Sequence, residues 1–356
     1  FFKNPEKAGY QISPDGKYFS YMAPYENRLN LFVQEVGSDK ATRITSETVR
    51  DLAGSMWANG HRILYIKDTA GDENFQLYGV NVDGTDSKAY TAFPKVRTTI
   101  IDPLENIDSL VIIGLNKRNP QVFDPYRLNL NNGELTQLAE NPGNIQGWMT
   151  DHNGKLRVAL AIVDGVNTQI LYRETEEQPF RPVLTTNFRE TVSFATFTPD
   201  NKMVYALTNI GRDKTALVLM DPATCEEKEV LYTNDKYDIS GLGYSELKKK
   251  LISVSCTGGT IRHYFDKNEE AIRTKLEQKL EGYDINTTSE DKSENIRIIY
   301  AGGDRTYGTY YTYNVKEDKL TKIADLAPWI KEEDMVPMHP RKAPPLWMDT
   351  KTPALV

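Results

Sequence analysis

Short polar turns alternate with apolar strands at a nearly constant spacing along the chain. The turn Ser13-Pro14-Asp15-Gly16, for example, is followed by an alternating apolar segment at 18–21, and this arrangement recurs six more times. The turn centres lie near residues 16, 60, 106, 154, 201, 247 and 292, so neighbouring centres are 44 to 48 residues apart. A repeat of this length is typical of four-stranded propeller blades. The pattern predicts an all-β fold, a seven-bladed β-propeller of four-stranded antiparallel blades that spans residues 1–330.

The second repeat shows how one unit divides into strands. Four apolar or alternating segments are predicted as strands A to D, counted outward from the axis: 53–57, 62–66, 75–82 and 87–91. Innermost strands are crowded around the axis, and the small residues Gly54, Gly147 and Gly241 fall in predicted A strands. A pair of β-sandwiches would also use short strands, but it gives no reason for a constant period.

One segment, residues 268–282, breaks the strand pattern. Asn268 is predicted to cap a helix that has acidic residues in its first turn, and Gly282 is predicted to end it. One face carries an apolar stripe at helical spacing: Ile272, Leu276 and Leu280. We expect an amphipathic helix that replaces or covers the outer strand of blade 6 and packs on the rim. Binding of a partner is the alternative role.

The composition changes after Trp329. Five prolines fall between residues 337 and 353 without any strand period, so residues 331–356 are predicted to be a Pro-rich linker or tail.

Composition and charge narrow the class of protein. The 20 Tyr and 12 Phe favour strands over helices. With 43 basic and 50 acidic residues the net charge is −7, and because no basic block is present, nucleic acid is not expected as a partner. The longest apolar runs, 110–115 and 158–163, are far shorter than the roughly 20 residues of a membrane span, so no membrane segment is expected.

The first residue is Phe1 rather than Met, which indicates that an N-terminal segment was removed. This predicts a periplasmic or secreted protein. A start chosen for expression would explain it equally, so a cytoplasmic location stays open.

Two cysteines exclude a disulfide scaffold and a Cys-rich zinc site. Cys225 is predicted in the C–D turn of blade 5, and Cys256 at the far end of strand B in blade 6. A strand of five or six residues separates those ends by roughly 17–20 Å, far beyond the reach of a disulfide. Both are predicted to be free thiols.

Neither a metal nor another cofactor is expected. His61 and His152 fall in A–B turns, His263 in an outer strand and His339 in the tail, so they are not expected to meet on one ion together with a carboxylate. The acidic loop 68–74 lacks the 12-residue spacing of a calcium hand. Of the functions that the sequence allows, a metal-dependent propeller enzyme has the least support from its residues.

The amino-acid sequence within the repeats is more informative than their spacing. The loop Gly71-Asp72-Glu73-Asn74, followed by Leu77-Tyr78, lies in the second repeat, and His263-Tyr264-Phe265-Asp266 precedes the predicted helix. Together with Gly308-Thr309-Tyr310-Tyr311, these stretches resemble the N-terminal propeller of prolyl-oligopeptidase-family serine peptidases, in the branch of acylaminoacyl peptidases and dipeptidyl peptidases.

In that family the propeller precedes an α/β-hydrolase domain that carries the catalytic Ser, Asp and His. A nucleophile elbow requires Gly-x-Ser-x-Gly, and the nearest string, 243–247, lacks the last glycine. Ser245 is therefore interpreted as a surface turn residue, and no catalytic residue is predicted in this chain. The resemblance implies a non-catalytic propeller that gates and orients peptides for a hydrolase domain absent from the chain.

The partners implied are peptides and that hydrolase domain, while homo-oligomerisation is left open. The alternative is a free-standing exported propeller that acts as a binding module for proteins or ligands.

Binding residues are expected on the loops between strands B and C, because in the resembling family that end faces the hydrolase. Asp72 and Glu73 are predicted to hold a substrate ammonium by charge-assisted hydrogen bonds. The alternative is that they cap their own hairpin and pair with a neighbouring arginine. The predicted substrate-binding residues on these loops are Arg28, Asp72, Glu73, Asn74, Arg118, Arg212 and Arg305.

Overall fold

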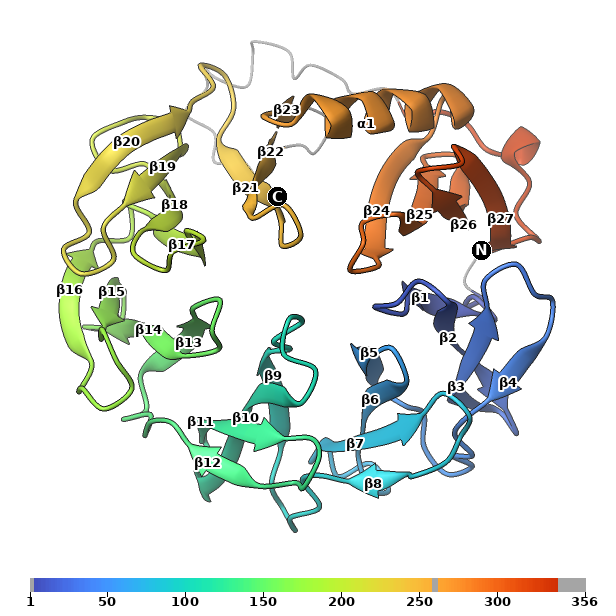
Figure 1. The fold of residues 1–356 in the computed structure, drawn as a ribbon, viewed down its shortest axis with the longest axis horizontal. Helices are drawn as coiled ribbons and strands as arrows, with labels where there is room; N and C mark the ends of the chain where they lie inside the picture. Colours follow the sequence, from blue (N-terminus) through green and yellow to red (C-terminus); the bar gives the residue numbers. More distant parts are fainter. Residues whose placement is uncertain (1–2, 258–261, 339–356) are drawn as a thin grey trace, which may run out of the picture.

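The computed structural model, which describes residues 3–257 and 262–338, has seven antiparallel sheets arranged as a ring around a central axis (Figure 1). Each sheet is a blade made from one continuous segment of chain. The predicted seven-bladed propeller is confirmed, and all seven predicted turn centres fall between the first two strands of a blade.

Blades 1 to 4 each contain four strands, ordered from the axis outward. Blade 1 comprises β1 (Ala8–Ile12), β2 (Tyr18–Tyr25), β3 (Arg28–Glu35) and β4 (Ala41–Arg43). Blade 2 comprises β5 (Gly54–Asn59), β6 (Arg62–Lys67), β7 (Gln76–Asn81) and β8 (Lys88–Ala89). Blade 3 comprises β9 (Thr98–Asp102), β10 (Leu110–Asn119), β11 (Val122–Asn129) and β12 (Leu135–Gln137). Blade 4 comprises β13 (Ile145–Thr150), β14 (Leu156–Val163), β15 (Asn167–Tyr172) and β16 (Arg181–Thr186).

Blade 6 alone among these sheets has three strands rather than four. Blade 5 comprises β17 (Val192–Phe197), β18 (Val204–Thr208), β19 (Ala216–Met220) and β20 (Glu227–Tyr232). Blade 6 comprises β21 (Ile239–Ser245), β22 (Lys250–Cys256) and β23 (Arg262–Tyr264), followed by helix α1 (Lys267–Lys279). Blade 7 comprises β24 (Asp284–Glu290), β25 (Ile296–Gly303), β26 (Thr306–Asn314) and β27 (Lys319–Asp325), followed by the short 3-10 helix η1 (Glu332–Asp334).

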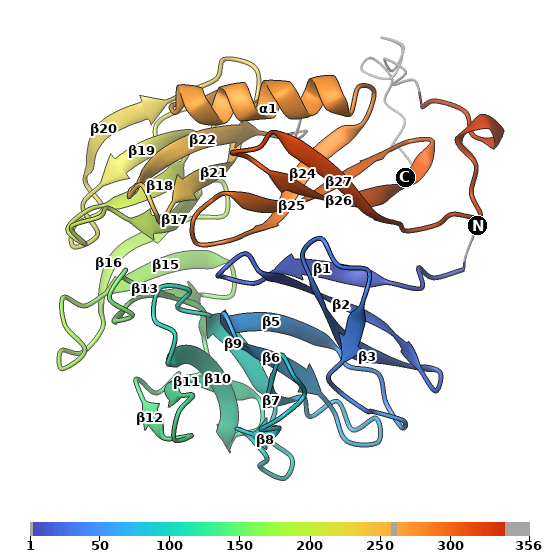
Figure 2. The same cartoon turned by 45° about the vertical axis from the view of Figure 1, so that its right-hand side comes forward.

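Helix α1 stands in for the fourth strand of blade 6, as expected, and lies along the rim toward blade 7 (Figures 1 and 2). The predicted apolar stripe is confirmed, because Leu276 and Leu280 are buried in a cluster with residues of blade 7 and Ile272 packs against it. The predicted cap is wrong. Asp266, not Asn268, is the N-cap, and its carboxylate accepts hydrogen bonds from the backbone N–H groups of Asn268 and Glu269.

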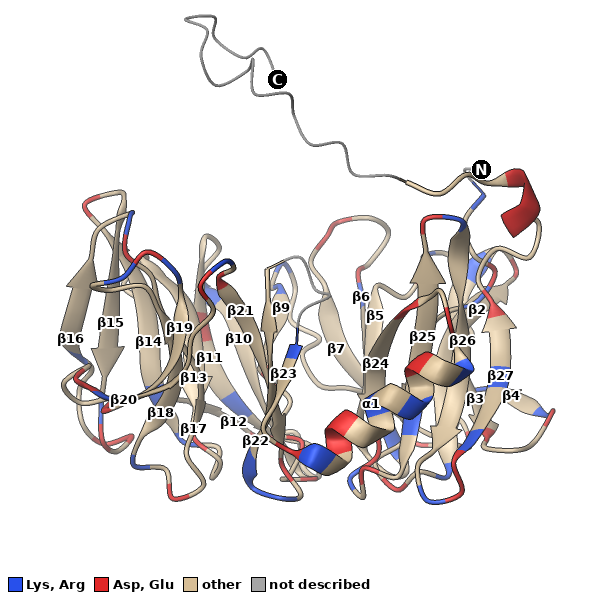
Figure 3. Cartoon of the chain, turned by 90° about the horizontal axis from the view of Figure 1, so that it is seen from above, with Lys and Arg blue, Asp and Glu red and all other residues tan. Residues whose placement is uncertain are grey.

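Antiparallel pairing gives the propeller two distinct ends. The A–B and C–D turns lie at one end, called here the A–B end, and the B–C and D–A loops lie at the other, called the B–C end. The N-terminal residues and η1 are at the B–C end (Figure 3). The short helix lies within the predicted linker 331–356, and the part of that linker from residue 339 onward lies outside the described residues.

Apolar clusters join most pairs of neighbouring blades. Such clusters link blades 1 and 2, 2 and 3, 4 and 5, 5 and 6, and 7 and 1. A cavity of about 450 Å³ lies between blades 3 and 4 instead. Small residues lie in the inner strands as predicted: a Cβ on Gly243 would come within 2.8 Å of the Ser253 hydroxyl.

Two further predictions concern single residues. Cys225 and Cys256 are both free and lie in the predicted turn and strand end. The prediction of a surface position for Ser245 is wrong, because its side chain is 3 % exposed. It accepts a hydrogen bond from the Lys248 backbone N–H (2.8 Å) and donates one to Glu294 of blade 7. Ser245 therefore ties a turn of blade 6 to its neighbour.

Candidate functional site

All seven predicted binding residues lie at or beside B–C hairpins, at the B–C end of the propeller. They belong to five blades, and the only side-chain hydrogen bond between two of them joins Asn74 to Asp72 among the described residues. The structure places them on one end without gathering them into a single pocket.

The loop between β6 and β7 is organised by Asp68 and Asp72. Asp68 is buried, forms an ion pair with Arg50 (3.2 Å) and accepts the Glu73 backbone N–H (3.3 Å). Asp72 accepts the backbone N–H groups of Thr69 and Asn74, and its other oxygen accepts the Asn74 side-chain amide. The Asn74 amide lowers the pKa of Asp72 most. Asp72 and Asn74 therefore act as the cap of their own loop, which agrees with the alternative interpretation.

Glu73 differs from Asp72. Its backbone is left-handed (φ 56°), its side chain is exposed, and no ion pair engages it among the described residues. Arg28 and Arg305 are likewise without an ion pair in that part of the chain. These three side chains are accessible for a ligand, and whether they bind one stays a prediction.

Arg118 and Arg212 are held by carboxylates of their own blades. Arg118 makes a bidentate pair with the fully buried Asp124 (2.8 and 2.9 Å) and also donates to the Asn141 carbonyl. One nitrogen of Arg212, Nη2, donates to both carboxylate oxygens of Glu227 (2.8 and 2.7 Å). Removing either arginine would leave a carboxylate unpaired. The geometry thus favours a structural role for both, which sequence spacing alone did not indicate.

Exposed apolar side chains gather at the same end. Of the twelve large apolar side chains that are exposed in the described part of the chain, three lie on strands or turns elsewhere: Val230, Leu247 and Phe265. Tyr307 lies at the start of β26, beside a B–C turn, and the other eight lie on B–C or D–A loops or on the C-terminal segment: Val49, Val166, Phe188, Ile210, Tyr237, Tyr283, Val336 and Met338. They are distributed over several blades at that end, and a continuous exposed apolar patch would mark contact with another protein surface.

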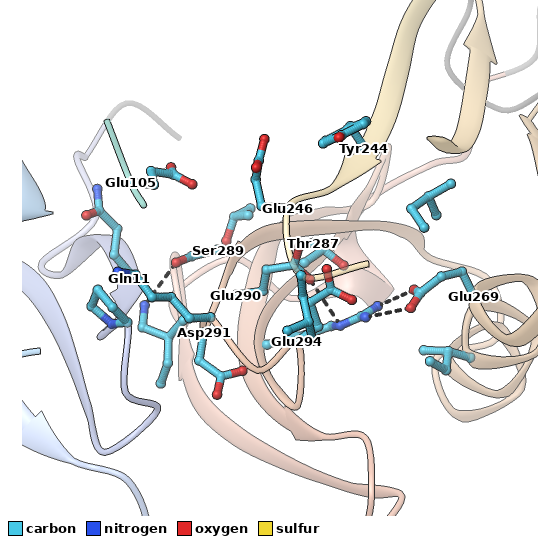
Figure 4. A pocket seen from close by; sticks show the side chains of 18 of the residues that line it. Gln11, Glu105, Tyr244, Glu246, Glu269, Thr287, Ser289, Glu290, Asp291 and Glu294 are labelled. Carbon is cyan, nitrogen blue, oxygen red and sulfur yellow. Dashed lines mark hydrogen bonds and ion pairs between the residues drawn. The ribbon is translucent and has the colours of Figure 1, made fainter. Parts of the chain in front are cut away.

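A large cavity lies at the opposite, A–B end, with a volume of about 980 Å³ (Figure 4). Inner strands and A–B turns of blades 1, 2, 3, 6 and 7 line it, and α1 and β23 close its outer side. Its lining includes the acidic side chains Glu105, Glu246, Glu269, Glu290, Asp291 and Glu294. Sequence analysis did not single out these acids, because each is an ordinary turn or first-turn residue in its own repeat.

Two kinds of carboxylate line this cavity. Glu269 receives two hydrogen bonds from Arg297 (2.8 and 3.0 Å) and one from Lys248 (2.9 Å). Burial works against its ionisation, but these hydrogen bonds outweigh that cost and lower the pKa of Glu269. Glu105 and Glu290 behave differently: burial and, to a smaller extent, nearby carboxylates raise the pKa of each, although Arg297 lies 3.3 Å from Glu290.

No set of three His, Cys, Asp or Glu side chains within residues 3–257 and 262–338 is arranged to hold a metal ion. The helices of the described structure are too short and too polar to cross a membrane.

Comparisons with known proteins agree with the expected resemblance. The chain is 28% identical over 351 residues to dipeptidyl aminopeptidase BIII of Pseudoxanthomonas mexicana, a match that covers 95% of this chain and 50% of that protein. It is 26% identical over 274 residues to dipeptidyl peptidase family member 6 of Caenorhabditis elegans, covering 71% of this chain and 36% of that one. No family model matches the sequence.

Solved structures show the same fold. Prolyl endopeptidases analysed for interdomain dynamics align with a TM-score of 0.59 and 11% identity, over 90% of this chain and 50% of theirs. Prolyl oligopeptidase B from Galerina marginata aligns with a TM-score of 0.58 and 10% identity, over 93% of this chain and 52% of its own. The chain spans half or less of the curated relatives it matches. It is thus a seven-bladed propeller similar to the propeller portion of dipeptidyl aminopeptidases and prolyl oligopeptidases.

Proposed function

We propose that this chain is the propeller half of an exported peptidase of the dipeptidyl peptidase type, which gates and orients peptides for a catalytic α/β-hydrolase domain and contributes no catalytic residue itself. The gathering of nine exposed apolar side chains at the B–C end carries this proposal. A free-standing propeller has no need of such a surface, whereas a propeller that supports a second domain does.

The position of the C-terminal segment supports the same arrangement. Tyr283 donates to Glu332 of η1 (2.7 Å), Lys3 lies over the Trp329 ring (4.7 Å), and Asp304 accepts the Met338 backbone N–H. The last described residues are therefore fixed against the B–C end of blade 7. Residue 338 thus lies at the same end as the exposed apolar loops.

The test joins this chain to the catalytic half of the Pseudoxanthomonas relative and measures release of dipeptides from peptides with free amino termini. Activity that needs both halves supports the proposal. A catalytic half that neither binds the chain nor gains activity from it contradicts the proposal and favours the free-standing binding module.

In the same fusion, Glu73→Gln is expected to reduce kcat/KM for peptides with a free amino terminus by about 5- to 150-fold, since removing one charge from a partly desolvated pair costs roughly 1–3 kcal/mol. Matched N-acetylated peptides carry no ammonium and should change little. Glu26→Gln is the control, because Glu26 is an exposed acid on the B–C turn of blade 1. Equal losses for both kinds of peptide would make Glu73 a structural residue.

A further inference from the structure

The A–B turn of blade 3, residues 103–109, reaches across the axis to blades that are not its neighbours. The Asn106 amide donates to Glu246 Oε2 in the A–B turn of blade 6 (2.9 Å). Lys292 Nζ in the A–B turn of blade 7 lies 2.6 Å from Asp108 Oδ1. Asn106 and Glu246 are 140 positions apart in the chain, and Asp108 and Lys292 are 184 positions apart. Contacts between nearly opposite blades require their turns to meet over the channel.

The turn is firmly shaped at its base. Leu104 is buried with a left-handed backbone (φ 52°), and Asp102 accepts its backbone N–H (2.8 Å). The Ile107 N–H then donates to the Leu104 carbonyl (2.7 Å), and the Leu110 N–H donates to the Ile107 carbonyl (3.0 Å). The tip of the turn is thereby directed inward rather than left to extend into solvent.

Glu246 is the anchor on the far side. Besides Asn106, it lies 3.4 Å from His152 Nδ1 of blade 4 and 3.7 Å from Lys249 Nζ of its own turn. The His152 ring stacks on Tyr244 with centroids 5.5 Å apart. Figure 4 shows Glu246 and Glu105 among the side chains that line the large cavity.

The positions of two cavities show the effect of this bridge on the channel. One cavity of about 980 Å³ and a second of about 300 Å³, lined mostly by blades 3 to 5, occupy the A–B end. Both are lined by Pro103, Glu105, Asn106 and Glu246. The bridge from blade 3 to blade 6 therefore forms a wall common to both, and it divides the mouth of the channel in two.

We infer that residues 103–109 form a crossbar that closes the A–B mouth of the channel to extended peptides and so determines which substrates reach the other end. The closure itself follows from this chain alone, whereas its effect on substrates rests on the proposed function. Lys292 and Asp108 are 41 and 62 % exposed, and ion pairs this open stabilise a structure only weakly. The crossbar is a reversible closure.

Amide hydrogen exchange on this chain tests the closure. Lys292→Met combined with Glu246→Ala removes both anchors from blades 6 and 7. Exchange at Ile107 and Leu110 in blade 3 is expected to accelerate at least threefold. Lys316→Met is the matched control. Lys316 is exposed in the C–D turn of blade 7, and in the described structure this turn makes no contact with blade 3. Unchanged exchange in the double variant would overturn the crossbar.

The fusion with a catalytic half tests the effect on substrates. For the Lys292→Met/Glu246→Ala pair, kcat/KM for a 12-residue peptide is expected to rise at least threefold while that for a dipeptidyl nitroanilide stays the same. An unchanged ratio of the two substrates would overturn the role in selection. If the parent fusion also cleaves neither substrate, the proposed function is contradicted. The exchange measurement then tests on its own whether the crossbar closes the channel.

Discussion

Blade 7 meets its two neighbours through surfaces of different composition: an apolar cluster toward blade 1, and toward blade 6 a set of ion pairs, called here the polar seam, beside the apolar cluster that α1 forms with blade 7. Toward blade 1, Ile298 packs with Tyr10, Phe19 and Tyr21 in an apolar cluster, in which the Tyr10 and Tyr310 rings are 4.9 Å apart. Toward blade 6, the adjacent residue Arg297 pairs with Glu269 beside the large cavity. One strand, β25, thus supplies an apolar seam and a polar seam from alternate side chains.

The comparison explains how the ring closes without exchanging a strand between its ends. Blades 7 and 1, which contain the two ends of the ring, are joined by aromatic packing and by a hydrogen bond from the Ile12 N–H to the Ser289 hydroxyl (3.1 Å). Blade 6 lacks its fourth strand, so the seam between blades 6 and 7 depends on α1 and on ion pairs. The seam beside the helix therefore combines ion pairs with apolar packing of α1 on blade 7, whereas the ring is closed mainly by aromatic packing.

The largest effect is expected from breaking the polar seam. Arg297→Met leaves Glu269 without its bidentate partner in a site where both side chains are at most 10 % exposed. Removing one member of a buried pair costs about 3–5 kcal/mol. Urea unfolding of the variant measures the loss, and the double variant Arg297→Met/Glu269→Leu should recover part of it. A loss below about 1 kcal/mol would show that the pair does not hold the seam.

The apolar seam is broken by Ile298→Ala. Ile298 is fully buried between blades 7 and 1, and truncations of this kind cost about 2–5 kcal/mol through lost burial and the cavity left behind. Urea unfolding in low and high salt separates the two seams. Salt should not reduce the loss for Ile298→Ala, since no charge is involved. A loss that vanished in 1 M salt would contradict the apolar character of this seam.

Sequence patterns predicted the blades but not the seams. The turn period located all seven sheets because each blade is a local unit. Two ion pairs join residues of separate repeats: Arg297 with Glu269, and Lys292 with Asp108. The residue pattern within one repeat does not predict such contacts. The predicted site shows the same limit: Arg118 and Arg212 occupy the expected loops, yet their carboxylate partners on neighbouring strands, which local pattern did not indicate, favour a structural role.

The third prediction concerns pH and the cap of α1. A hydrogen bond from Lys250 and those from the helix N–H groups lower the pKa of Asp266 from 3.8 to about 2. Because the folded pKa lies below the unfolded one, the stabilisation is present above pH 4 and is lost as the pH falls from about 4 to about 2. Asp266→Asn keeps the cap but not the charge, so we expect a loss of about 1–2 kcal/mol at pH 7.

The contrast between pH 7 and pH 3 is the measurement for this variant. The difference in unfolding free energy between parent and Asp266→Asn should shrink at pH 3, because the parent carboxylate is then partly protonated in the unfolded chain. Asp39→Asn is the control, since Asp39 is exposed in the C–D turn of blade 1 and its side chain forms no hydrogen bond or ion pair within the described residues. A difference that grew at low pH would contradict the assignment.

The smallest effect is expected from a hydrogen bond in the apolar seam that joins a backbone group of blade 1 to a side chain of blade 7. Ser289→Ala removes the acceptor for the buried Ile12 N–H, and one such bond contributes about 0.5–1.5 kcal/mol. Ser289→Thr keeps a hydroxyl at the position and should retain most of the stability. If Ser289→Ala cost as much as Ile298→Ala, ring closure would depend on hydrogen bonding rather than on packing. A loss of only about 1 kcal/mol, by contrast, would leave the aromatic cluster as the element that joins the two ends of the ring.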